Sequence, residues 1–290
     1  MNTSLHNASE NDNILYLCCG QQSSGSTLIS WCFLQRDDMD GVLDCQYDFL
    51  PDTHYFLPWL ETLQDPRLRW YKHTIASFRA TEVKAYLEDA GRRVVPLLVV
   101  RDVEAVWESL IRKSYGRNST TAEDPPLRLR FRRFLEDWEY HRDQGLPILR
   151  FESFLSDPEN SLRTACEAMG LTWNRAMLDW PKPESSIMDC RFGNVTFHES
   201  RGTNLGETLS TKASGTSKSA HISEADRAWL REVFAEYNRV NGYASEGATP
   251  TEDVPVATPD FRFSRRHRWL WPYYSTKRIA WLAKRPRALR

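Results

Sequence analysis

One stretch near the start of the chain limits its possible folds more than any other. Residues 14–19 (ILYLCC) form a continuous apolar run, a Gly/Ser turn follows at 20–25, and the segment 26–36 is again mostly apolar. Such a run predicts a strand that is covered on both faces, as in a parallel sheet. The segment after the turn is apolar on nearly all sides, which predicts a buried helix. We therefore expect a strand, a tight turn and a helix at the start of an α/β domain.

The turn has the spacing of a phosphate-binding loop. Residues 20–27 read G-x-x-x-x-G-S-T, which is the P-loop spacing with Ser26 in place of the lysine. A turn of this kind at a helix N-terminus can surround a phosphate or sulfate with backbone N–H groups. The missing lysine argues against hydrolysis of a nucleoside triphosphate. We expect an anion-binding loop made of Gln22, Ser23, Ser24, Gly25, Ser26 and Thr27.

Strand and helix patterns alternate along the rest of the chain. Further strands are expected at 68–74, 94–100 and 147–151, and helices at 83–90, 103–111, 125–144, 158–169 and 223–240. Residues 174–220 are rich in Ser, Thr and Gly and are interpreted as a long loop that covers or binds a substrate. The alternation predicts one α/β domain with a central parallel sheet and helices on both faces.

Polar clusters follow three of the apolar strands. They are the loop at 20–27, the pair Lys72-His73 and the pair Arg101-Asp102. Ligands bind at the carboxyl ends of the strands in such sheets, so neighbouring strands would bring these clusters together. This edge is the expected site.

Charge is distributed unevenly along the chain. The chain has 290 residues and a formal charge of −1, and its tail at 261–290 contains ten Lys and Arg residues and no Asp or Glu. Since the tail carries +10 and the whole chain −1, the remaining residues carry −11. An acidic body argues against nucleic acid as a partner. The tail mixes basic residues with Trp and Tyr, which indicates contact with an anionic membrane surface, or else a basic tail that folds onto the acidic body.

Composition also suggests the segments of the chain and its location. We expect a disordered N-terminus at 1–13, the α/β domain at 14–243, a linker at 244–260 and the basic aromatic tail at 261–290. The six cysteines form no C-x-x-C pair, which indicates reduced thiols. No signal-peptide pattern is present, and no apolar run reaches the roughly 18 residues of a spanning helix. A cytoplasmic protein is expected, with peripheral membrane contact through the tail.

Three separate blocks carry motifs. The first is the strand, loop and helix at 17–31. The second begins with 97–102 (LLVVRD) and extends to Ser109, which places a Ser eight residues after an Arg at a strand end. The third is 149–154 (LRFESF), followed by Asp-Pro-Glu and, further on, by Gly-Leu at 170–171.

In this order the blocks resemble the superfamily of sulfotransferases that use 3′-phosphoadenosine 5′-phosphosulfate (PAPS). The first is similar to the family's 5′-phosphosulfate loop. The second is similar to its 3′-phosphate block, which implies that Arg101 and Ser109 hold the 3′-phosphate. The third looks like its strand-Glu-helix segment, and the resemblance covers about residues 14 to 243. A sulfuryl group in transfer carries one negative charge, so N–H donors, hydroxyls and one or two cations suffice, and no metal is expected.

The sequence departs from the family pattern at the loop cation. Cytosolic members carry Lys or Arg before the Ser-Gly pair of the loop, and this chain has Ser23 there. A cation from elsewhere is expected to replace it, with Lys72, Arg201, Lys212 and Lys218 as the candidates. Arg201 with Gly202 is also loosely similar to the family's Arg-Lys-Gly segment, which covers the donor.

The general base is the second departure. The family uses a Lys-Thr-His triplet, and this chain has Lys72-His73-Thr74, so alignment on Lys72 places Thr74 at the base position. We favour His73, because the pKa of an ordinary histidine, about 6.5, suits a base at neutral pH. An acid from 37–61 is the alternative, and a second reading of His73 is a strand-end histidine without a catalytic role.

The resulting interpretation is a PAPS-dependent sulfotransferase with Lys72 and His73 as catalytic residues. The acceptor would be a hydroxyl of a carbohydrate, glycolipid or small metabolite. One alternative is a catalytically silent binder of PAPS or adenosine 3′,5′-bisphosphate, which Ser23 favours. The other is a P-loop kinase-like phosphotransferase, which Ser26 disfavours.

Overall fold

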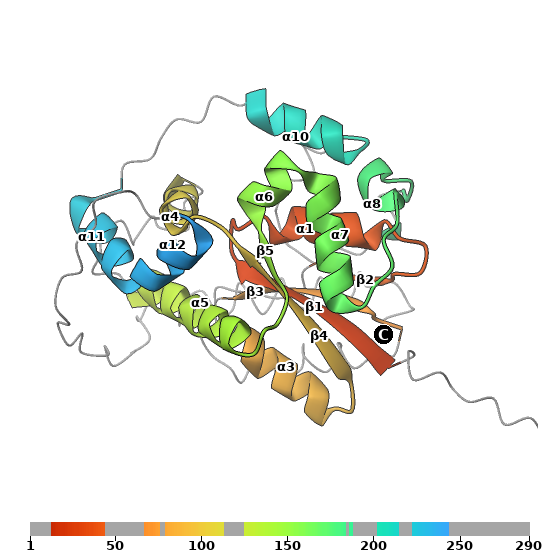
Figure 1. The fold of residues 1–290 in the computed structure, drawn as a ribbon, viewed down its shortest axis with the longest axis horizontal. Helices are drawn as coiled ribbons and strands as arrows, with labels where there is room; N and C mark the ends of the chain where they lie inside the picture. Colours follow the sequence, from red (N-terminus) through yellow and green to blue (C-terminus); the bar gives the residue numbers. More distant parts are fainter. Residues whose placement is uncertain are drawn as a thin grey trace, which may run out of the picture. The chain divides into compact units, whose positions relative to one another are not determined.

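A five-stranded sheet forms the centre of the computed structural model, which describes residues 13–43, 67–75, 79–112, 125–183, 186–187, 202–214 and 222–243. The strands lie in the order β2-β3-β1-β4-β5 (Figure 1). They are β1 (Ile14–Gln21), β2 (Gly41–Val42), β3 (Trp70–Ile75), β4 (Arg93–Val100) and β5 (Ile148–Arg150). Every neighbouring pair is parallel, so the predicted parallel sheet is confirmed.

The central strands are covered on both faces, as their continuous apolar sequences require. In β1 the side chains from Leu15 to Cys19 are all buried, although consecutive side chains point to opposite faces. The register pairs Gly20 with Val99 of β4 and with Thr74 of β3. The loop after β1 therefore begins level with the carboxyl ends of both neighbouring strands.

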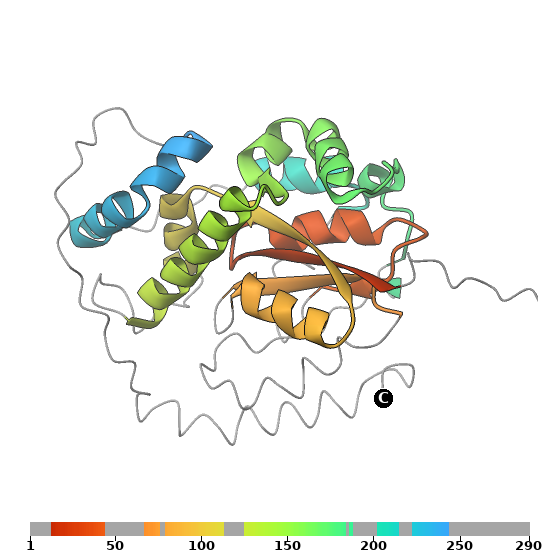
Figure 2. The same cartoon turned by 60° about the horizontal axis from the view of Figure 1, so that its bottom comes forward.

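Helices cover the two faces of the sheet (Figure 2). One face carries α1 (Ser26–Leu34) and α7 (Pro158–Met169), which share a core with Cys18, Leu97 and Val99. The other face carries α3 (Ala80–Asp89) and α5 (Pro125–Asp143). The predicted helices on both faces are confirmed. Three further helices lie beside the carboxyl ends of the strands, namely α4 (Val103–Arg112), α11 (Glu224–Val233) and α12 (Ala235–Asn241).

Several expected boundaries were wrong. Phe151 does not end a strand but begins the short helix α6 (Phe151–Ser156). The segment 174–220, expected to be a loop, contains α8 (Ala176–Asp179) and α10 (Leu205–Ser214) within its described part. The start of α10 is fixed by Asn204, whose side chain accepts a hydrogen bond from the Glu207 N–H at 2.8 Å. The sequence did not indicate this cap, because Ser, Thr and Asn are common both at helix N-caps and in loops.

The expected last helix at 223–240 is two helices. They meet at Phe234, whose buried ring packs edge-on against Phe131 and Tyr237, with centroids 5.9 and 5.6 Å away. This packing is a tertiary contact that helical periodicity does not encode. The strand β2 was not expected either.

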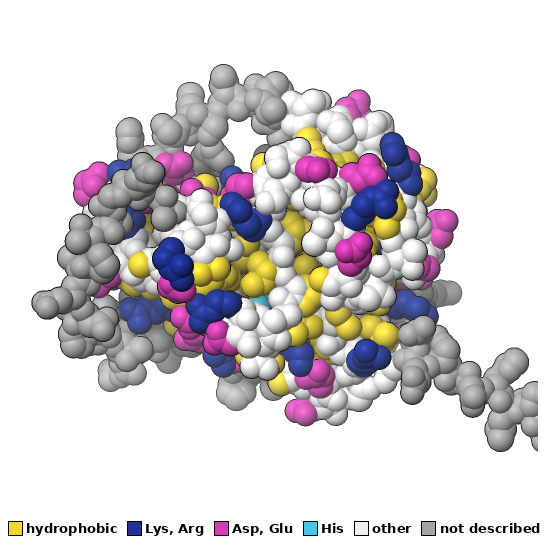
Figure 3. Space-filling model, viewed as in Figure 1, with side chains coloured by type: hydrophobic (Ala, Val, Ile, Leu, Met, Phe, Trp, Pro, Cys, Tyr) yellow, Lys and Arg dark blue, Asp and Glu magenta, His cyan; other side chains and the backbone are white. Residues whose placement is uncertain are grey.

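The described surface mixes charges of both signs. Figure 3 shows Lys and Arg side chains interspersed with Asp and Glu on one face. Some of these charges form pairs about one helical turn apart, such as Arg163–Glu159 and Arg239–Glu236. No helix within the described ranges is both long and apolar enough to cross a membrane. The segment 1–12, the linker 244–260 and the tail 261–290 lie outside the described residues.

Candidate functional site

The loop after β1 has the backbone of an anion-binding turn. Ser23 has a φ of 70° and Gly25 a φ of 94°, and between them the Ser24 N–H donates to the Gln21 carbonyl at 3.0 Å. The helix α1 begins directly afterwards at Ser26, with Gly25 at its N-cap position. Because glycine offers no capping side chain, the first N–H groups of α1 remain available to a ligand at the positive end of the helix dipole.

Glycine at position 20 permits close packing inside the loop. A Cβ atom there would lie 2.5 Å from the Ser24 Oγ and 3.1 Å from the Val99 carbonyl oxygen. The chain can therefore fold back over the end of β1 only with glycine at this position. The structure thus brings the predicted loop residues together as one compact turn.

Within the described part of the chain, two polar side chains of this loop are buried without a hydrogen-bond partner. Gln21 is 3% exposed and Ser24 is 1% exposed. Among the described residues, neither the amide atoms of Gln21 nor the hydroxyl of Ser24 has a hydrogen-bond partner. Leaving such groups unsatisfied costs about 1–3 kcal/mol each, so they indicate a place where a ligand or water completes the hydrogen bonds.

Arg101 reaches the loop from the end of β4. Its Nη1 donates to the Ser23 carbonyl at 2.8 Å, and its guanidinium carbon lies 5.1 Å from the centre of the Phe151 ring. The predicted convergence of the loop and the Arg101 cluster is therefore observed. Ser109 is buried on α4, about two helical turns beyond Arg101.

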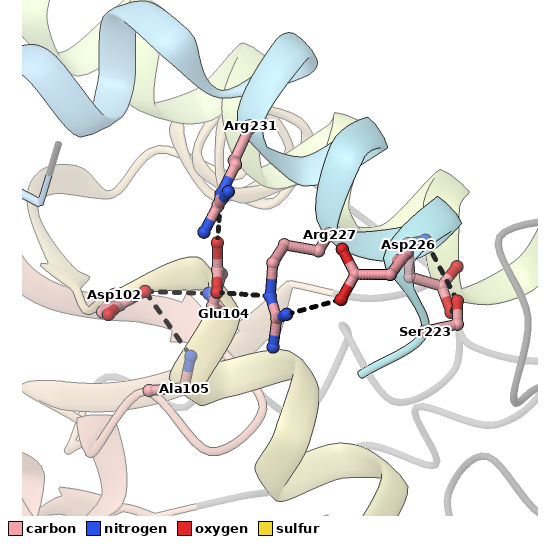
Figure 4. Close-up of polar contacts among 8 residues, drawn as sticks. Asp102, Glu104, Ala105, Ser223, Asp226, Arg227 and Arg231 are labelled. Atoms are coloured by element: carbon pink, nitrogen blue, oxygen red, sulfur yellow. Dashed lines mark hydrogen bonds and ion pairs between the residues drawn. The ribbon is translucent and has the colours of Figure 1, made fainter. Parts of the chain in front are cut away.

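Asp102, next to Arg101, starts the helix that carries Ser109. Its Oδ1 accepts a hydrogen bond from the Glu104 N–H at 2.8 Å (Figure 4). Glu104 in turn binds Arg227 and Arg231 of α11, with Nε–carboxylate distances of 3.3 and 3.0 Å. Burial raises the pKa of Asp102, and the N–H donors of α4 oppose this shift. The Asp102 carboxylate thus caps α4, and Glu104 links α4 to α11.

Lys72 and His73 lie on opposite faces of the sheet. Lys72 is level with Cys18, on the face covered by α1, and its Nζ donates to the Thr74 hydroxyl. His73 is level with Cys19 on the α3 and α5 face and is completely buried. Alternation along a strand separates two consecutive side chains in this way. The residue level with Gly20 at the start of the loop is Thr74.

Three further contacts at this edge were missed in the sequence. Arg130 of α5 donates from Nη1 to the Gln22 side-chain oxygen at 3.3 Å, which places a cation beside the loop. Tyr237 of α12 hydrogen-bonds to the backbone of Arg101. Glu152 of α6 accepts a hydrogen bond from the Asp102 N–H at 3.1 Å. No local pattern distinguishes Arg130 from the other arginines of α5, and none connects Tyr237 with Arg101.

The remaining candidate cations cannot be placed. Arg201 and Lys218 lie outside the described residues, as does the side chain of Lys212 on α10. Arg101, Arg130 and Lys72 are described cations with contacts that reach the loop or the adjoining strand end.

Comparison with known proteins gives a likeness in backbone only. No family model and no curated protein sequence matches the chain. The sulfotransferase domain from the Synechococcus PCC 7002 olefin synthase is similar over 77% of this chain and 94% of that one, with 16% identity and a TM-score of 0.49. A sulfotransferase domain from the curacin biosynthetic pathway is similar over 76% of this chain and 96% of that one, with 14% identity and a TM-score of 0.45.

Proposed function

We propose that the protein transfers a sulfuryl group from PAPS to an acceptor hydroxyl. The observation that carries the proposal is the contact between Arg101 and the loop. An arginine at the end of β4 reaches a Gly/Ser turn that has unpartnered buried polar groups and an uncapped helix N-terminus. A donor with two separate anionic groups fits this arrangement, with the phosphosulfate at the loop and the 3′-phosphate at Arg101 and Ser109.

The transfer step is an in-line displacement at sulfur. The acceptor oxygen forms a bond to sulfur while the bond from sulfur to the 5′-phosphate oxygen breaks. The acceptor proton passes to a base, and adenosine 3′,5′-bisphosphate leaves. Charge develops on the oxygen that links sulfur and phosphorus, so a cation next to it lowers the barrier.

We propose two of the described cations for that oxygen. Lys72 is on the α1 side of the sheet beside Thr74, and Arg130 is next to Gln22 of the loop. We assign them jointly to the role that Ser23 cannot fill. His73 remains the proposed base, and it lies completely buried on the α3 and α5 face of the sheet.

Binding without an acceptor tests the donor site first. We expect adenosine 3′,5′-bisphosphate to bind in calorimetry without Mg²⁺, and Arg101→Ala to weaken it by about 10- to 100-fold, the effect of one hydrogen bond to a charged group. Arg93→Ala is the matched control, because Arg93 is exposed at the opposite end of the same strand. Absence of binding to the wild type, or equal binding by folded Arg101→Ala, would reject the proposal.

A second candidate is a catalytically silent binder of the same nucleotide. Ser23 favours it, because this side chain cannot supply the loop cation. Transfer of labelled sulfate from PAPS to a library of hydroxyl acceptors separates the two functions. An enzyme gives a labelled product that His73→Gln abolishes while nucleotide binding persists. A binder gives no product with any acceptor.

We further propose that the protein acts in the cytoplasm on a saccharide, lipid-linked or small-molecule acceptor. The basic aromatic tail at 261–290 supports peripheral contact with anionic lipid. Co-sedimentation with anionic liposomes tests this part. Equal partitioning of the full chain and of residues 1–260 would rule out a membrane role of the tail.

A further inference from the structure

The joint between β4 and α4 is held by side chains from distant parts of the chain. Arg101 and Asp102 belong neither to the strand, which ends at Val100, nor to the helix, which begins at Val103. The Asp102 carbonyl accepts the Val106 N–H at 2.9 Å within the first turn of α4. The other three backbone polar groups of the joint need partners from outside, because buried N–H and C=O groups are rarely left unpaired.

One hydroxyl supplies two of these partners. The Tyr237 oxygen accepts a hydrogen bond from the Arg101 N–H at 3.1 Å and donates its proton to the Arg101 carbonyl at 2.7 Å. The peptide groups on both sides of the Arg101 Cα are thus tied to one point, 136 residues further along the chain. This fixes the direction in which the arginine side chain leaves the strand.

The ring of Tyr237 is held as firmly as its hydroxyl. Tyr237 is completely buried, and its ring lies edge-on to Phe134 and Trp138, with centroids 5.5 and 5.1 Å away. Burial raises the pKa of Tyr237 well above its usual value, so its hydroxyl keeps the proton that it donates. A ring packed in this way has little freedom to follow Arg101 if the joint moves.

A second pair of residues completes the joint. Glu152 accepts the Asp102 N–H at 3.1 Å with one oxygen and the Tyr243 hydroxyl at 2.6 Å with the other. Tyr243 also stacks on Tyr237, with centroids 5.7 Å apart. Both tyrosines belong to residues 222–243, so this segment holds the end of β4 in place.

We propose that Tyr237 is a positioning residue that aims Arg101 at the 3′-phosphate of a nucleotide, and that Tyr243 supports it through Glu152. The inference deepens the proposed function and rests on it. Its consequence is selectivity: the C-terminal helices decide how strongly the protein prefers a nucleotide with a 3′-phosphate over one without it. A merely structural role of Tyr237 would not favour one nucleotide over the other.

The test compares two nucleotides and needs no acceptor. Calorimetry gives the dissociation constants of adenosine 3′,5′-bisphosphate and adenosine 5′-monophosphate for the wild type and for Tyr237→Phe. We expect the preference for the bisphosphate, which is its affinity divided by that of the monophosphate, to fall about tenfold in the variant, since one weakened charge-assisted contact has an effect of this size. Binding of the monophosphate should be unchanged. Tyr140→Phe is the control, because it removes a hydroxyl from a tyrosine that is 37% exposed on α5.

Each outcome is decisive. If the wild type does not bind adenosine 3′,5′-bisphosphate, the proposed function fails and this inference with it. If the wild type binds and the ratio of folded Tyr237→Phe equals that of the wild type, the inference alone is overturned. If Tyr237→Phe does not fold, Tyr243→Phe replaces it, because Tyr243 is less buried. An unchanged ratio in that variant is likewise a refutation.

Discussion

Replacing Gly25 by alanine should destabilise the protein for two reasons, a strained backbone conformation and a steric clash. Gly25 has a φ of 94°, a backbone conformation that costs an L-amino acid about 1–2 kcal/mol. A Cβ atom there would also lie 2.2 Å from two carbons of the Phe151 ring. Forcing that ring to move adds about 1–3 kcal/mol, as in other overpacked cores. The expected loss of unfolding free energy is about 2–5 kcal/mol.

The control separates the two parts of this cost. Gly170 has a φ of 71° at the end of α7, and a Cβ atom there meets nothing within 4 Å. Gly170→Ala should therefore carry the backbone cost alone, about 1–2 kcal/mol. Urea unfolding followed by circular dichroism gives both free energies by linear extrapolation. Equal destabilisation by the two variants would refute the argument from the Phe151 contact.

Phe151 lies beside both Gly25 and Arg101, so it connects the loop with the proposed nucleotide site. The guanidinium of Arg101 lies over the Phe151 ring, so a displaced ring should weaken binding of adenosine 3′,5′-bisphosphate as well. The double variant Gly25→Ala/Phe151→Leu gives the alanine more room. Its destabilisation should be smaller than the sum of the single effects, because the two side chains touch. A strictly additive result would show that Phe151 is not the obstacle.

Two further predictions concern α5. Arg130→Ala should weaken adenosine 5′-monophosphate and adenosine 3′,5′-bisphosphate by the same factor of about ten, the effect of one hydrogen bond to a charged group, because Arg130 contacts the loop at Gln22. A change in the ratio of the two dissociation constants would contradict this placement. The second prediction is a pH dependence of stability. Burial lowers the pKa of His141 from 6.5 to about 4, so the unfolded chain binds more protons between these values and stability rises with pH there. Burial raises the pKa of Asp137 from 3.8 to about 6, so the native state binds more protons and stability falls with rising pH in that window. The two slopes, each up to about 1.4 kcal/mol per pH unit, offset each other in the wild type. In Asp137→Asn only the His141 contribution to the pH dependence remains. The free energy of unfolding in urea should therefore differ more between about pH 4.5 and about pH 6 in the variant than in the wild type. Equal differences would mean that the pKa of Asp137 is not raised by burial, and a variant whose stability does not change between the two pH values would mean that His141 is not held neutral by its burial.

Local sequence was enough to predict the elements that form the loop. A continuous apolar run predicts a doubly covered strand, and glycines at 20 and 25 predict a tight turn, because both features depend on neighbours in the chain. The parallel sheet and the meeting of Arg101 with the loop followed from the order of strands and helices. Alternation along β3 also separates Lys72 from His73 once the strand is known.

Only the tertiary structure decided which groups hold and complete that edge. The partners of Arg101, Asp102 and Gln22 come from positions 136, 50 and 108 residues away, respectively. Such contacts arise from the packing of α5, α6 and α12 around a buried aromatic cluster. Helical periodicity predicts which face of a helix is buried, but it does not predict which element packs against that face. The sequence by itself thus determined a strand, a Gly/Ser loop and an arginine at the next strand end. The fold decided that a tyrosine near the end of the domain fixes this arginine and that an arginine of α5 stands beside a loop without a cation of its own.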